Sequence, residues 1–539
     1  MFVKEVTQKR KDGTSVVYLH LVDSVWDPEK KSPRHQVIKS LGRKDQIDSD
    51  AIGRLINSLR RYLEPEKAAG PVFEEVLSSK QFGLPYLLGQ LWRQLGIDKF
   101  FHGKLRDRNI DAPIERCLFA MTAQRACDPG SKLACEQWAG SAAHIPGLPS
   151  VQVQQLYRAM DFLVEHGPEL ENDIYLQVSE LLDLDLSVVF YDTTALYFQI
   201  EEEDEAGLRK RGHCKPGNGG HLPQVSVGLA VNRKGIPIRH WVWPGNTADV
   251  ATVQQVVEDL KGLRPRRFLF AGDRGMISDA NIDYLESRGL KYILGVEMRK
   301  DGRAEDLLSV RGSYREIDED VSFKQKLVEE GDREVRYLLC LNKKSAARDQ
   351  AKRQEMAEKL RQELQRPRAP EEGSAWSAQM LGHSLWRRWL KKDARGRLQL
   401  DEAALAAEAR YDGKYLLVSN DLETDGGKLV EGFRELCRIE RSVETMNGAL
   451  DARPVYHRTE QRIRAHIQLC VLAYTLLRTA ELRAGTTWHQ ISNILSPLPA
   501  VHVRFCDGTA VQRGQLTAEM RAICQKMEIP APPRVLELS

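Results

Sequence analysis

The hydrophobic pattern divides the chain into regions of different period. Over residues 14–45, short apolar runs such as SVVYLHLVDSVWD and HQVIKSLG alternate with polar residues, which predicts a β-hairpin unit over residues 1–46. From residue 47 to 185, apolar residues recur at helical spacing, as in SDAIGRLINSLRRYL and VQQLYRAMDFLVEHG. This helical region is either a DNA-binding or dimerisation region or a plain scaffold.

The next region, from residue 186 to 296, is rich in strands. The runs SVVFYDTTALYF, PQVSVGLAVN and GIPIRHWVWPG predict an antiparallel meander. A helix with Thr247 or Asp249 as N-cap follows, and then strand RRFLFAGDRG, helix SDANIDYLESRG and strand KYILGVE. This order of elements is that of a ribonuclease-H-like α/β fold, and we predict its first part here.

Residues 297–410 interrupt that order. They mix the strands DVSFKQKLVEE and REVRYLLCLN with a charged helix and the stretch RPRAPEEGSAW, which predicts an insertion domain. The core pattern resumes with strand GKYLLVSND and a long helix that begins near Lys428. We therefore predict the second part of the core over residues 411–480 and a C-terminal region over residues 481–539.

Length and composition narrow the class of protein. A chain of 539 residues exceeds one hydrophobic core, so roughly two to four structural units are expected. Because the net charge is only +3, a surface that binds a polyanion must come from local clustering of cations. The nine cysteines form no CxxC pair, which argues against a disulfide framework or a zinc ribbon. Since no apolar run has the length of a membrane span, we expect a cytoplasmic protein without a membrane partner.

Two aspartates stand on predicted strands. Asp192 lies in the middle of SVVFYDTTALYF, and a buried carboxylate there is costly unless its charge is compensated. Asp273 follows the apolar run FLFAG, at the strand end where α/β sheets bind ligands, although a turn aspartate that caps a helix is the commoner role. Thr193, Thr194 and Asp249 are candidates for orienting a carboxylate.

A glutamate stands in the helix predicted after the last strand. Residues at alternating spacings of 4 and 3 share one face of this helix: Leu429, Phe433, Leu436, Glu440, Val443, Asn447 and Leu450. Glu440 is in the centre of this mostly apolar face, so it should point toward the sheet. A buried ion pair with Arg438 or Arg441 is the alternative explanation.

The three carboxylates can converge on one site. Asp192, Asp273 and Glu440 would lie on a central strand, at the end of a neighbouring strand and on a helix against the sheet. Carboxylates at such short range raise each other's pKa unless a cation lies between them. Oxygen ligands select Mg²⁺ or Mn²⁺, and two such ions suit an in-line phosphoryl displacement. We therefore predict a site with two divalent metal ions.

These motifs together resemble a known family. YDTTALYF, GIPIRHWVWPGNTAD, AGDRGMIS, YLLVSND and RIERSVETMNGALDARPVYHRTEQRIRAHI resemble, in this order, bacterial insertion-sequence transposases of the DDE class. The resemblance is to the branch with the YREK signature, the insertion sequence four superfamily. It implies a retroviral-integrase-like core interrupted by a β-rich insertion, with Asp192, Asp273 and Glu440 as catalytic and metal-binding residues.

The resemblance also implies an activity and partners. Such an enzyme cleaves the inverted-repeat ends of a mobile element and joins the freed 3′-OH to target DNA, as a homodimer or larger synaptic assembly in the prokaryotic cytoplasm, associated with the nucleoid. The family's Tyr, Arg and Lys correspond to Phe433, Leu436 and Asn447, so two cations are missing. The alternatives are a non-catalytic DNA-binding descendant and a ribonuclease-H-like nuclease without strand transfer.

Basic clusters are the candidates for DNA contact. WRRWLKKDARGR combines cations with tryptophans, which suits phosphate and base contact, although an amphipathic helix with Trp386, Trp389 and Leu390 in a core explains it equally. LRKRGHCK follows the acidic run EEEDE and could also be plain exposed loop. The predicted DNA-binding residues are Arg209, Lys210, Arg211, Arg274, Arg387, Arg388, Lys391, Lys392, Arg434, Arg438 and Arg441.

Overall fold

A computed structural model of the chain describes most of its residues and divides them into two compact units. The first unit comprises Met1–Ser78, His502–Val511 and Glu537–Ser539, and the second comprises Ser79–Val501 and Gln512–Leu536. The described residues are 2–9, 15–27, 32–44, 73–106, 108, 112–148, 150–184, 188–200, 202–205, 207–212, 222–261, 269–272, 276, 278–298, 308, 313–331, 333–366, 373–383, 386–393, 397–435, 442, 444–446, 448, 450–505 and 508–538.

Strands form the N-terminal part of the chain, as the alternating pattern predicts. β1 (Phe2–Lys9), β2 (Ser15–Asp27) and β3 (Ser32–Arg43) make an antiparallel sheet in the order β1-β2-β3. The predicted helix SDAIGRLINSLRRYL lies outside the described residues. The prediction of helices from residue 47 onward is wrong at β4 (Phe73–Gln81), because this segment pairs with strands from the end of the chain.

The C-terminal region supplies the partners of β4. β16 (Pro499–Phe505), β17 (Gly508–Arg513) and β18 (Val535–Leu538) form a sheet in the order β18-β17-β16-β4. Hydrophobic periodicity is a local signal, so it does not report that a strand has its partner more than 400 residues away.

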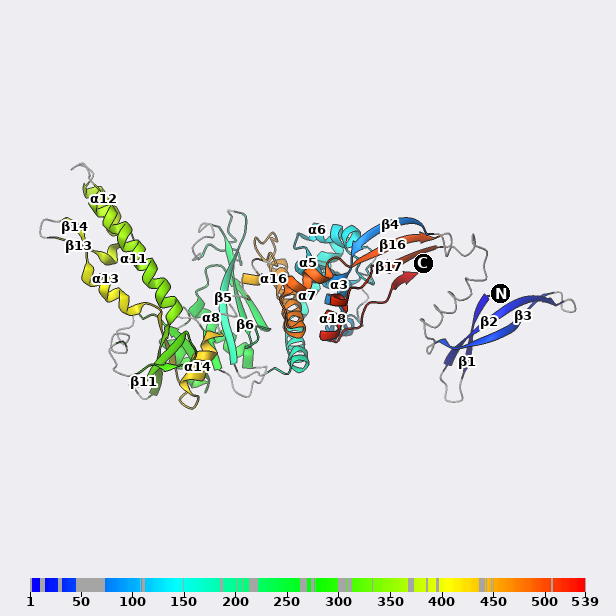
Figure 1. Cartoon of the computed structure of the whole chain (residues 1–539), viewed down its shortest axis with the longest axis horizontal. Helices are drawn as coiled ribbons and strands as arrows, with labels where there is room; N and C mark the ends of the chain where they lie inside the picture. The colour runs from blue at the N-terminus through cyan, green and yellow to red at the C-terminus, as the bar shows by residue number, and fades with distance from the viewer. Residues whose placement is uncertain are drawn as a thin grey trace. The chain divides into compact units, whose positions relative to one another are not determined.

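Helices from both ends of the second unit pack together (Figure 1). The helices α5 (Ile114–Cys127), α7 (Val153–Leu182) and α16 (Glu460–Ala484) contact one another, and α16 also contacts strand β7 (Pro237–Pro244) of the central sheet. Residues 411–480, predicted as the second part of the core, thus also complete the helical region. The helices are α3 (Gly83–Gln94), α4 (Ile97–Leu105), α5 (Ile114–Cys127), α6 (Lys132–Gln137), α7 (Val153–Leu182), α16 (Glu460–Ala484), α17 (Trp488–Leu495) and α18 (Ala518–Lys526).

The central sheet has the predicted meander and the predicted parallel strands. Its order is β10-β11-β12-β15-β9-β8-β5-β6-β7; β5, β6 and β7 pair antiparallel, whereas β5, β8 and β9 pair parallel. Because the meander ends at β7, this strand is one edge of the sheet. The elements are β5 (Val188–Tyr197), β6 (Gln224–Val231), β7 (Pro237–Pro244), α8 (Asp249–Lys261), β8 (Leu269–Gly272), α9 (Asp279–Ser287), β9 (Lys291–Val296) and β15 (Lys414–Ser419).

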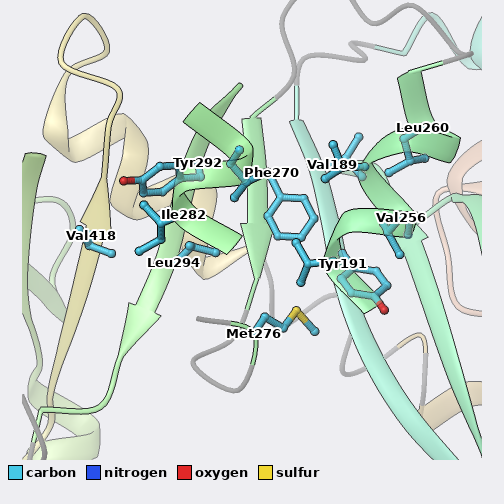
Figure 2. Packing of buried hydrophobic residues seen from close by; sticks show 14 of the residues in the cluster. Val189, Tyr191, Val256, Leu260, Phe270, Met276, Ile282, Tyr292, Leu294 and Val418 are labelled. Atoms are coloured by element: carbon cyan, nitrogen blue, oxygen red, sulfur yellow. The ribbon is translucent and has the colours of Figure 1, made fainter. Parts of the chain in front are cut away.

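One face of this sheet is packed under α8 and α9. Figure 2 shows Tyr191 of β5 and Phe270 of β8 side by side in this core, with Val256 of α8 against them. Tyr191 and Phe270 are completely buried. Because side chains alternate along a strand, Asp192 projects from the opposite face of β5.

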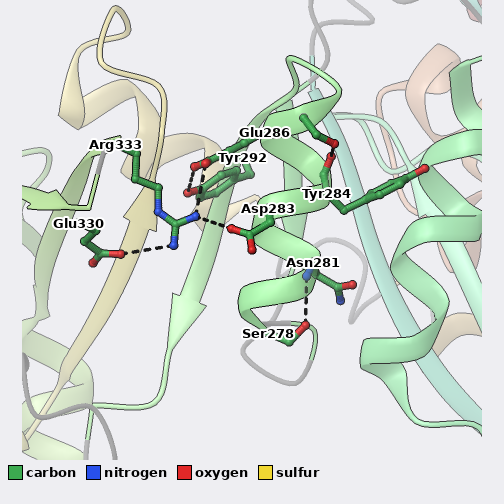
Figure 3. Close-up of polar contacts among 9 residues, drawn as sticks. Ser278, Asn281, Asp283, Tyr284, Glu286, Tyr292, Glu330 and Arg333 are labelled. Carbon is green, nitrogen blue, oxygen red and sulfur yellow. Dashed lines mark hydrogen bonds and ion pairs between the residues drawn. The ribbon is translucent and has the colours of Figure 1, made fainter.

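The sheet extends into residues that were predicted as insertion. β11 (Val321–Glu330) and β12 (Arg333–Asn342) form a hairpin, and β12 pairs with β15. Figure 3 shows Arg333 of β12 beside Asp283 and Glu286 of α9. Its guanidinium nitrogen Nη1 lies 2.8 Å from Asp283 Oδ1 and 3.3 Å from Glu286 Oε2. The predicted boundary at residue 297 is therefore wrong, because this hairpin buries its apolar face in the central core. The two-residue strand β10 (Arg315–Glu316) pairs with β11.

The inserted part that follows β12 is mostly helical in its described residues, so the prediction of a β-rich insertion is wrong. It has its own small core of Leu360, Met380, Trp389 and Leu390, which explains why its apolar residues do not continue the strand pattern. Its elements are α11 (Lys343–Gln365), α12 (Gly373–Gly382), η5 (Trp386–Trp389), β13 (Leu390–Lys392), β14 (Leu398–Leu400) and α13 (Glu402–Glu408). No helix among the described residues has both the length and the apolar character needed to cross a bilayer.

Candidate active site

Asp192 projects from the face of β5 that lies opposite α8 and α9. Its neighbour Tyr191 is fixed on the covered face, where its hydroxyl lies 2.7 Å from the hydroxyl of Thr252. The Asp192 carboxylate accepts a hydrogen bond from the backbone N–H of Thr193 at 2.8 Å. Asp192 is partly exposed, so the expectation of a buried carboxylate is wrong in degree. A ligand can therefore reach this carboxylate without the sheet opening.

The carboxylate of Asp249, at the start of α8, contacts β5 on the face that α8 covers. Thr193 is 5% exposed, and its hydroxyl donates to Asp249 Oδ1 at 2.5 Å. Thr247 or Asp249 is the predicted N-cap of the helix. α8 begins at Asp249 itself, and the Asp249 carboxylate accepts the hydrogen bond from Thr193 of β5. The contact holds the residue that follows Asp192, as expected for a group that orients a catalytic carboxylate indirectly.

The second predicted carboxylate follows a strand that lies directly beside β5. In the parallel ladder between β5 and β8, Tyr191 pairs with Gly272. In the sequence, Asp192 follows Tyr191 and Asp273 follows Gly272. Neighbouring strands are about 4.8 Å apart. Asp273 and Arg274 lie outside the described residues, so their convergence with Asp192 stays a prediction.

The third predicted carboxylate, Glu440, also lies outside the described residues, but the chain is described on both sides of it. Helix α14 (Gly426–Arg434) ends with Glu435 as its C-cap, whose carboxylate pairs with Arg233 at 3.7 Å. α14 is thus shorter than the predicted long helix. Further along, the completely buried Ser442 lies 2.7 Å from the hydroxyl of Tyr474.

The flanking contacts place both ends of this segment along β5. Arg233 belongs to the turn after β6, beside the pair formed by Val231 and Phe190. At the other end of β5, the N–H of Val455 donates to the carbonyl of Tyr197 at 3.1 Å. Glu435 and Val455 therefore lie near opposite ends of β5, and Asp192 lies between these ends.

A cleft adjoins the same segment. It has a volume of about 590 Å³ and is lined by Thr445, Tyr474 and Arg478 together with residues of α17 and the turn after β6. The guanidinium of Arg478 donates to the carbonyl of Lys234 at 2.8 Å and to Glu481 at 2.8 Å, which ties α16 to the turn. This tie holds together two of the elements that line the cleft.

The YREK-like positions are only partly described. The ring of Phe433 stacks on Tyr415 of β15 with centroids 6.3 Å apart, so it packs against the sheet. Leu436 and Asn447 lie outside the described residues, as do Arg438 and Arg441. Arg434 donates to Asp318 at 2.5 Å and lowers the pKa of that carboxyl to about 2. Its charge is thus already matched within the protein.

Two arginines of LRKRGHCK pair with acids of EEEDE, and Lys210 contacts the backbone of the same run. Arg209 pairs with Asp204 and lowers its pKa, Lys210 donates to the carbonyl of Glu205 at 2.9 Å, and Arg211 lies 3.5 Å from Glu203. These pairs favour the interpretation of this stretch as an exposed loop of mixed charge.

Arg387 and Arg388 lie on the 3-10 turn η5, and Lys391 and Lys392 lie on the strand β13, so the alternative of an amphipathic helix is wrong for these residues. Trp389 and Leu390 are buried in the small core of the insertion, and Trp386 stacks on His383 at 4.3 Å. Arg387, Arg388 and Lys392 are exposed, and Lys391 donates to Asp401 at 3.2 Å. The apolar residues of this stretch thus form a core, and DNA contact by its exposed cations stays a prediction.

Metal binding remains a prediction from the donor set. Within the part of the chain that the structure describes, no group of three or more His, Cys, Asp or Glu side chains is arranged to hold a metal ion. Of the three predicted ligands only Asp192 belongs to that part. The register of β5 and β8 and the partly exposed Asp192 fit oxygen ligation of a hard divalent ion.

Sequence comparison identifies two family models. Residues 3–69 match "IS1634 family transposase, N-terminal domain", and residues 198–476 match "Transposase DDE domain", which covers just over half of the chain. The second match includes Asp273 and Glu440 and begins after Asp192. Among curated proteins, none matches this sequence.

Solved structures of Mos1 transposase also match the chain. The paired-end complex with left transposon end is 15% identical, with a TM-score of 0.15, over 36% of this chain and 57% of that one. The strand transfer complex has the same identity and TM-score, over 36% and 56%. The mariner paired end complex with Mn is 15% identical, with a TM-score of 0.14, over 46% and 68%. The match thus spans less than two thirds of the first of these chains.

Proposed function

Because this chain belongs to the family of transposases with a DDE domain, we propose that it cleaves DNA at the ends of a mobile element and joins the freed 3′-OH to target DNA. The match to an insertion-sequence transposase N-terminal domain supports the same activity. The observation that carries the proposal is the pairing of Tyr191 with Gly272, since it brings together the strand positions that lead into Asp192 and Asp273.

In this proposal Asp192, Asp273 and Glu440 hold two Mg²⁺ or Mn²⁺ ions. When bound, the ions would supply a deprotonated nucleophile and neutralise charge at the scissile phosphate. The chain's own contribution is to orient the ligands. Thr193 donates its N–H to the Asp192 carboxylate and its hydroxyl to Asp249, and both contacts would orient Asp192.

The proposed partner is double-stranded DNA, both as element ends and as target. Arg387, Arg388 and Lys392 on the insertion are exposed cations that suit phosphate contact, together with Lys391 once its contact with Asp401 is released. Arg209, Arg211 and Arg434 would contribute less, because each is paired with a carboxylate of the protein. Lys210, which donates to the backbone carbonyl of Glu205, stays a candidate. Arg274, Arg438 and Arg441 stay candidates. Because two ends must be handled together, the active form would be a homodimer or larger assembly.

We also place the chain in the YREK-signature branch. Support comes from the order of its motifs, with Phe433 at the position of the family's Tyr. Because the ring of Phe433 packs on Tyr415, the hydroxyl that it lacks would not be needed for this packing. The loss of cations at Leu436 and Asn447 shifts the expected backbone contacts to other arginines of the same segment.

A cleavage assay tests the proposal. The full-length protein is incubated with Mg²⁺ or Mn²⁺ and DNA carrying the terminal sequences that flank its coding region. We expect nicked ends and, with target DNA present, a joined product. Asp192→Asn and Glu440→Gln should bind the same DNA but lose cleavage by at least about 1000-fold. Binding without cleavage by the wild type would contradict the proposal and favour a non-catalytic descendant, whereas nicking without joining would favour a nuclease.

A further inference from the structure

The loop that precedes helix α16, called here the α16 loop (residues 453–459), presents polar and charged side chains to solvent. Tyr456 is 67% exposed, and Arg458 is exposed and forms no ion pair with any residue that the structure describes. His457, between them, points the other way, because its ring packs edge-on against Tyr157 of α7 with centroids 6.3 Å apart. The loop therefore directs Arg458 away from the protein.

Two further arginines border the α16 loop, and both rest on tyrosine rings. The guanidinium of Arg453 lies over the ring of Tyr197, at the end of β5, 5.7 Å from the ring centroid. The guanidinium of Arg462, in the first turn of α16, lies 4.3 Å from the ring centroid of Tyr157 and 3.8 Å from Asp161 Oδ1. Because a stacked guanidinium contacts the ring through its face, N–H groups at its edge can donate to a phosphate.

Buried cations lie behind this surface. Lys132 of α6 is 3% exposed, and Arg125 of α5 is 4% exposed and donates to three backbone carbonyls. Within the described part of the chain, neither forms an ion pair, and the Lys132 amine has no hydrogen-bond partner. Burial, and then the charge of Arg125, lowers the pKa of Lys132 to about 8, so the amine stays charged at neutral pH.

The buried cations act on the α16 loop itself. Burial lowers the pKa of His457 to about 3, and the charges of Lys132, Arg125 and Arg462 lower it further. These cations are therefore close enough to the loop to add to its positive potential. A surface with such a potential attracts polyanions, even though the net charge of the whole chain is only +3.

The amino-terminal ends of two long helices lie at the same surface. Tyr157 near the start of α7 contacts Arg462 near the start of α16, and a Cβ at Gly167 further along α7 would lie 2.7 Å from Gln468 Nε2 of α16. The two helices therefore run side by side in the same direction (Figure 1). The helix dipole has its positive end at the amino terminus, so both helices favour an anion there.

The α16 loop is joined to the strand that carries Asp192. The N–H of Val455 donates to the carbonyl of Tyr197 at 3.1 Å, and Val455 forms a β-bridge with Phe198. Tyr197 follows Asp192 by five residues on β5, which is about 17 Å along the strand. Because successive nucleotides of a duplex are about 3.4 Å apart along its axis, this length corresponds to about five base pairs.

We infer that the α16 loop and the first turn of α16 form a DNA-binding surface, in which Arg453, Arg458 and Arg462 contact phosphates of duplex DNA. The inference rests on the proposed function, which supplies DNA as the partner. Contacts with phosphates position a duplex but do not read its sequence. The surface would therefore hold DNA of any sequence beside β5, and recognition of the element ends would require other residues.

The test measures the affinity of the full-length protein for a short labelled duplex of arbitrary sequence, by fluorescence anisotropy without divalent metal. Arg458→Gln should raise the Kd and reduce the slope of log K against log salt by about 0.9. The double variant Arg453→Gln, Arg458→Gln should reduce the slope by up to about 1.8. Arg458→Lys should keep most of the slope, because an ammonium also binds phosphate as a point charge.

The matched control is the double variant Arg521→Gln, Arg534→Gln. Both arginines are exposed in the C-terminal region, and neither forms an ion pair with another described residue. The control changes the net charge as much as the double variant of the loop, and its slope should stay near that of the wild type. An equal decrease in the control, or a wild-type slope in Arg458→Gln, overturns the inference. Circular dichroism verifies that each variant is folded, and Arg458→Gln alone decides if Arg453→Gln is not.

Because the assay contains no metal, its outcome is separate from that of the cleavage assay. A wild-type protein that binds the duplex but does not cleave element ends contradicts the proposed function alone, and the slopes of the loop variants still decide the inference. Cleavage by the wild type together with unchanged slopes in the loop variants overturns the inference alone. A wild-type protein that binds no duplex overturns both.

Discussion

Tyr191 on β5 pairs with Gly272 on β8 in a parallel ladder, and each residue is followed in the sequence by an aspartate. This register follows from the two apolar runs that end at these residues. It is the relationship on which the proposed chemistry depends, because it aligns the strand positions that lead into Asp192 and Asp273.

The register makes Gly272 sensitive to substitution. A Cβ at Gly272 would lie 3.1 Å from Met276 Sδ and 3.2 Å from a ring carbon of Phe270. Gly272→Val should therefore shift the end of β8 and reduce metal-dependent cleavage by about 10-fold or more, the scale reported for supporting residues. Gly103→Val is the control, because a Cβ at Gly103 would have no atom within 4 Å. Equal activity of the two variants would contradict the role of the register.

The contact between Thr193 and Asp249 should affect catalysis more than stability. Thr193→Val removes the hydroxyl that donates to Asp249 and should lower the cleavage rate by about 10-fold at limiting metal concentration. Tyr191→Phe removes a hydrogen bond from the same strand to the same helix and serves as control. It should lower the melting temperature without changing the metal requirement. Identical behaviour of both variants in metal titrations would show that Asp249 plays only a structural role.

The strands β5 and β8, which precede or contain the candidate aspartates, could be predicted because each depends on a local pattern. An apolar run interrupted by one acid is visible in the sequence, and so is the alternation of helices and strands from β5 to β9. The place of the hairpin β11–β12 could not be predicted, because its pairing with β15 depends on residues about 80 positions away. The same limit applies to Arg125 of α5, whose guanidinium donates to the backbone carbonyls of Leu450 and Asp451. Backbone acceptors far along the chain produce no recognisable pattern in the sequence.

Acid should destabilise the helical region through its buried histidines. Burial lowers the pKa of His457 from 6.5 to about 3. Between these two pH values the unfolded chain binds a proton that the folded chain does not, so the free energy of unfolding decreases as the pH falls from 6.5 toward 3. The maximum slope is about 1.4 kcal/mol per pH unit for one such group. Melting temperatures of the wild type and of His457→Phe at pH 7.5 and pH 5 check this. The difference between the two pH values should be smaller in the variant, and an equal difference would contradict it.

DNA affinity should depend on the exposed cations of the insertion. The triple variant Arg387→Ala, Arg388→Ala, Lys392→Ala should bind DNA more weakly at low salt. The slope of log K against log salt should decrease by up to about 0.9 for each lost phosphate contact. The comparator, Arg209→Ala with Arg211→Ala, should change the slope less, because these arginines are paired with Asp204 and Glu203. Both slopes are measured by fluorescence anisotropy. A larger change in the Arg209 and Arg211 variant than in the triple variant would contradict the prediction and favour DNA contact at the loop of Arg209 and Arg211.

The most direct test of the central claim is a crystal structure of the full-length protein soaked with Mn²⁺ and measured at a wavelength where Mn²⁺ scatters anomalously. The account predicts anomalous peaks in direct coordination with carboxylate oxygens of Asp192, Asp273 and Glu440. Peaks elsewhere, or a Glu440 side chain turned to solvent with no peak beside Asp192, would contradict it.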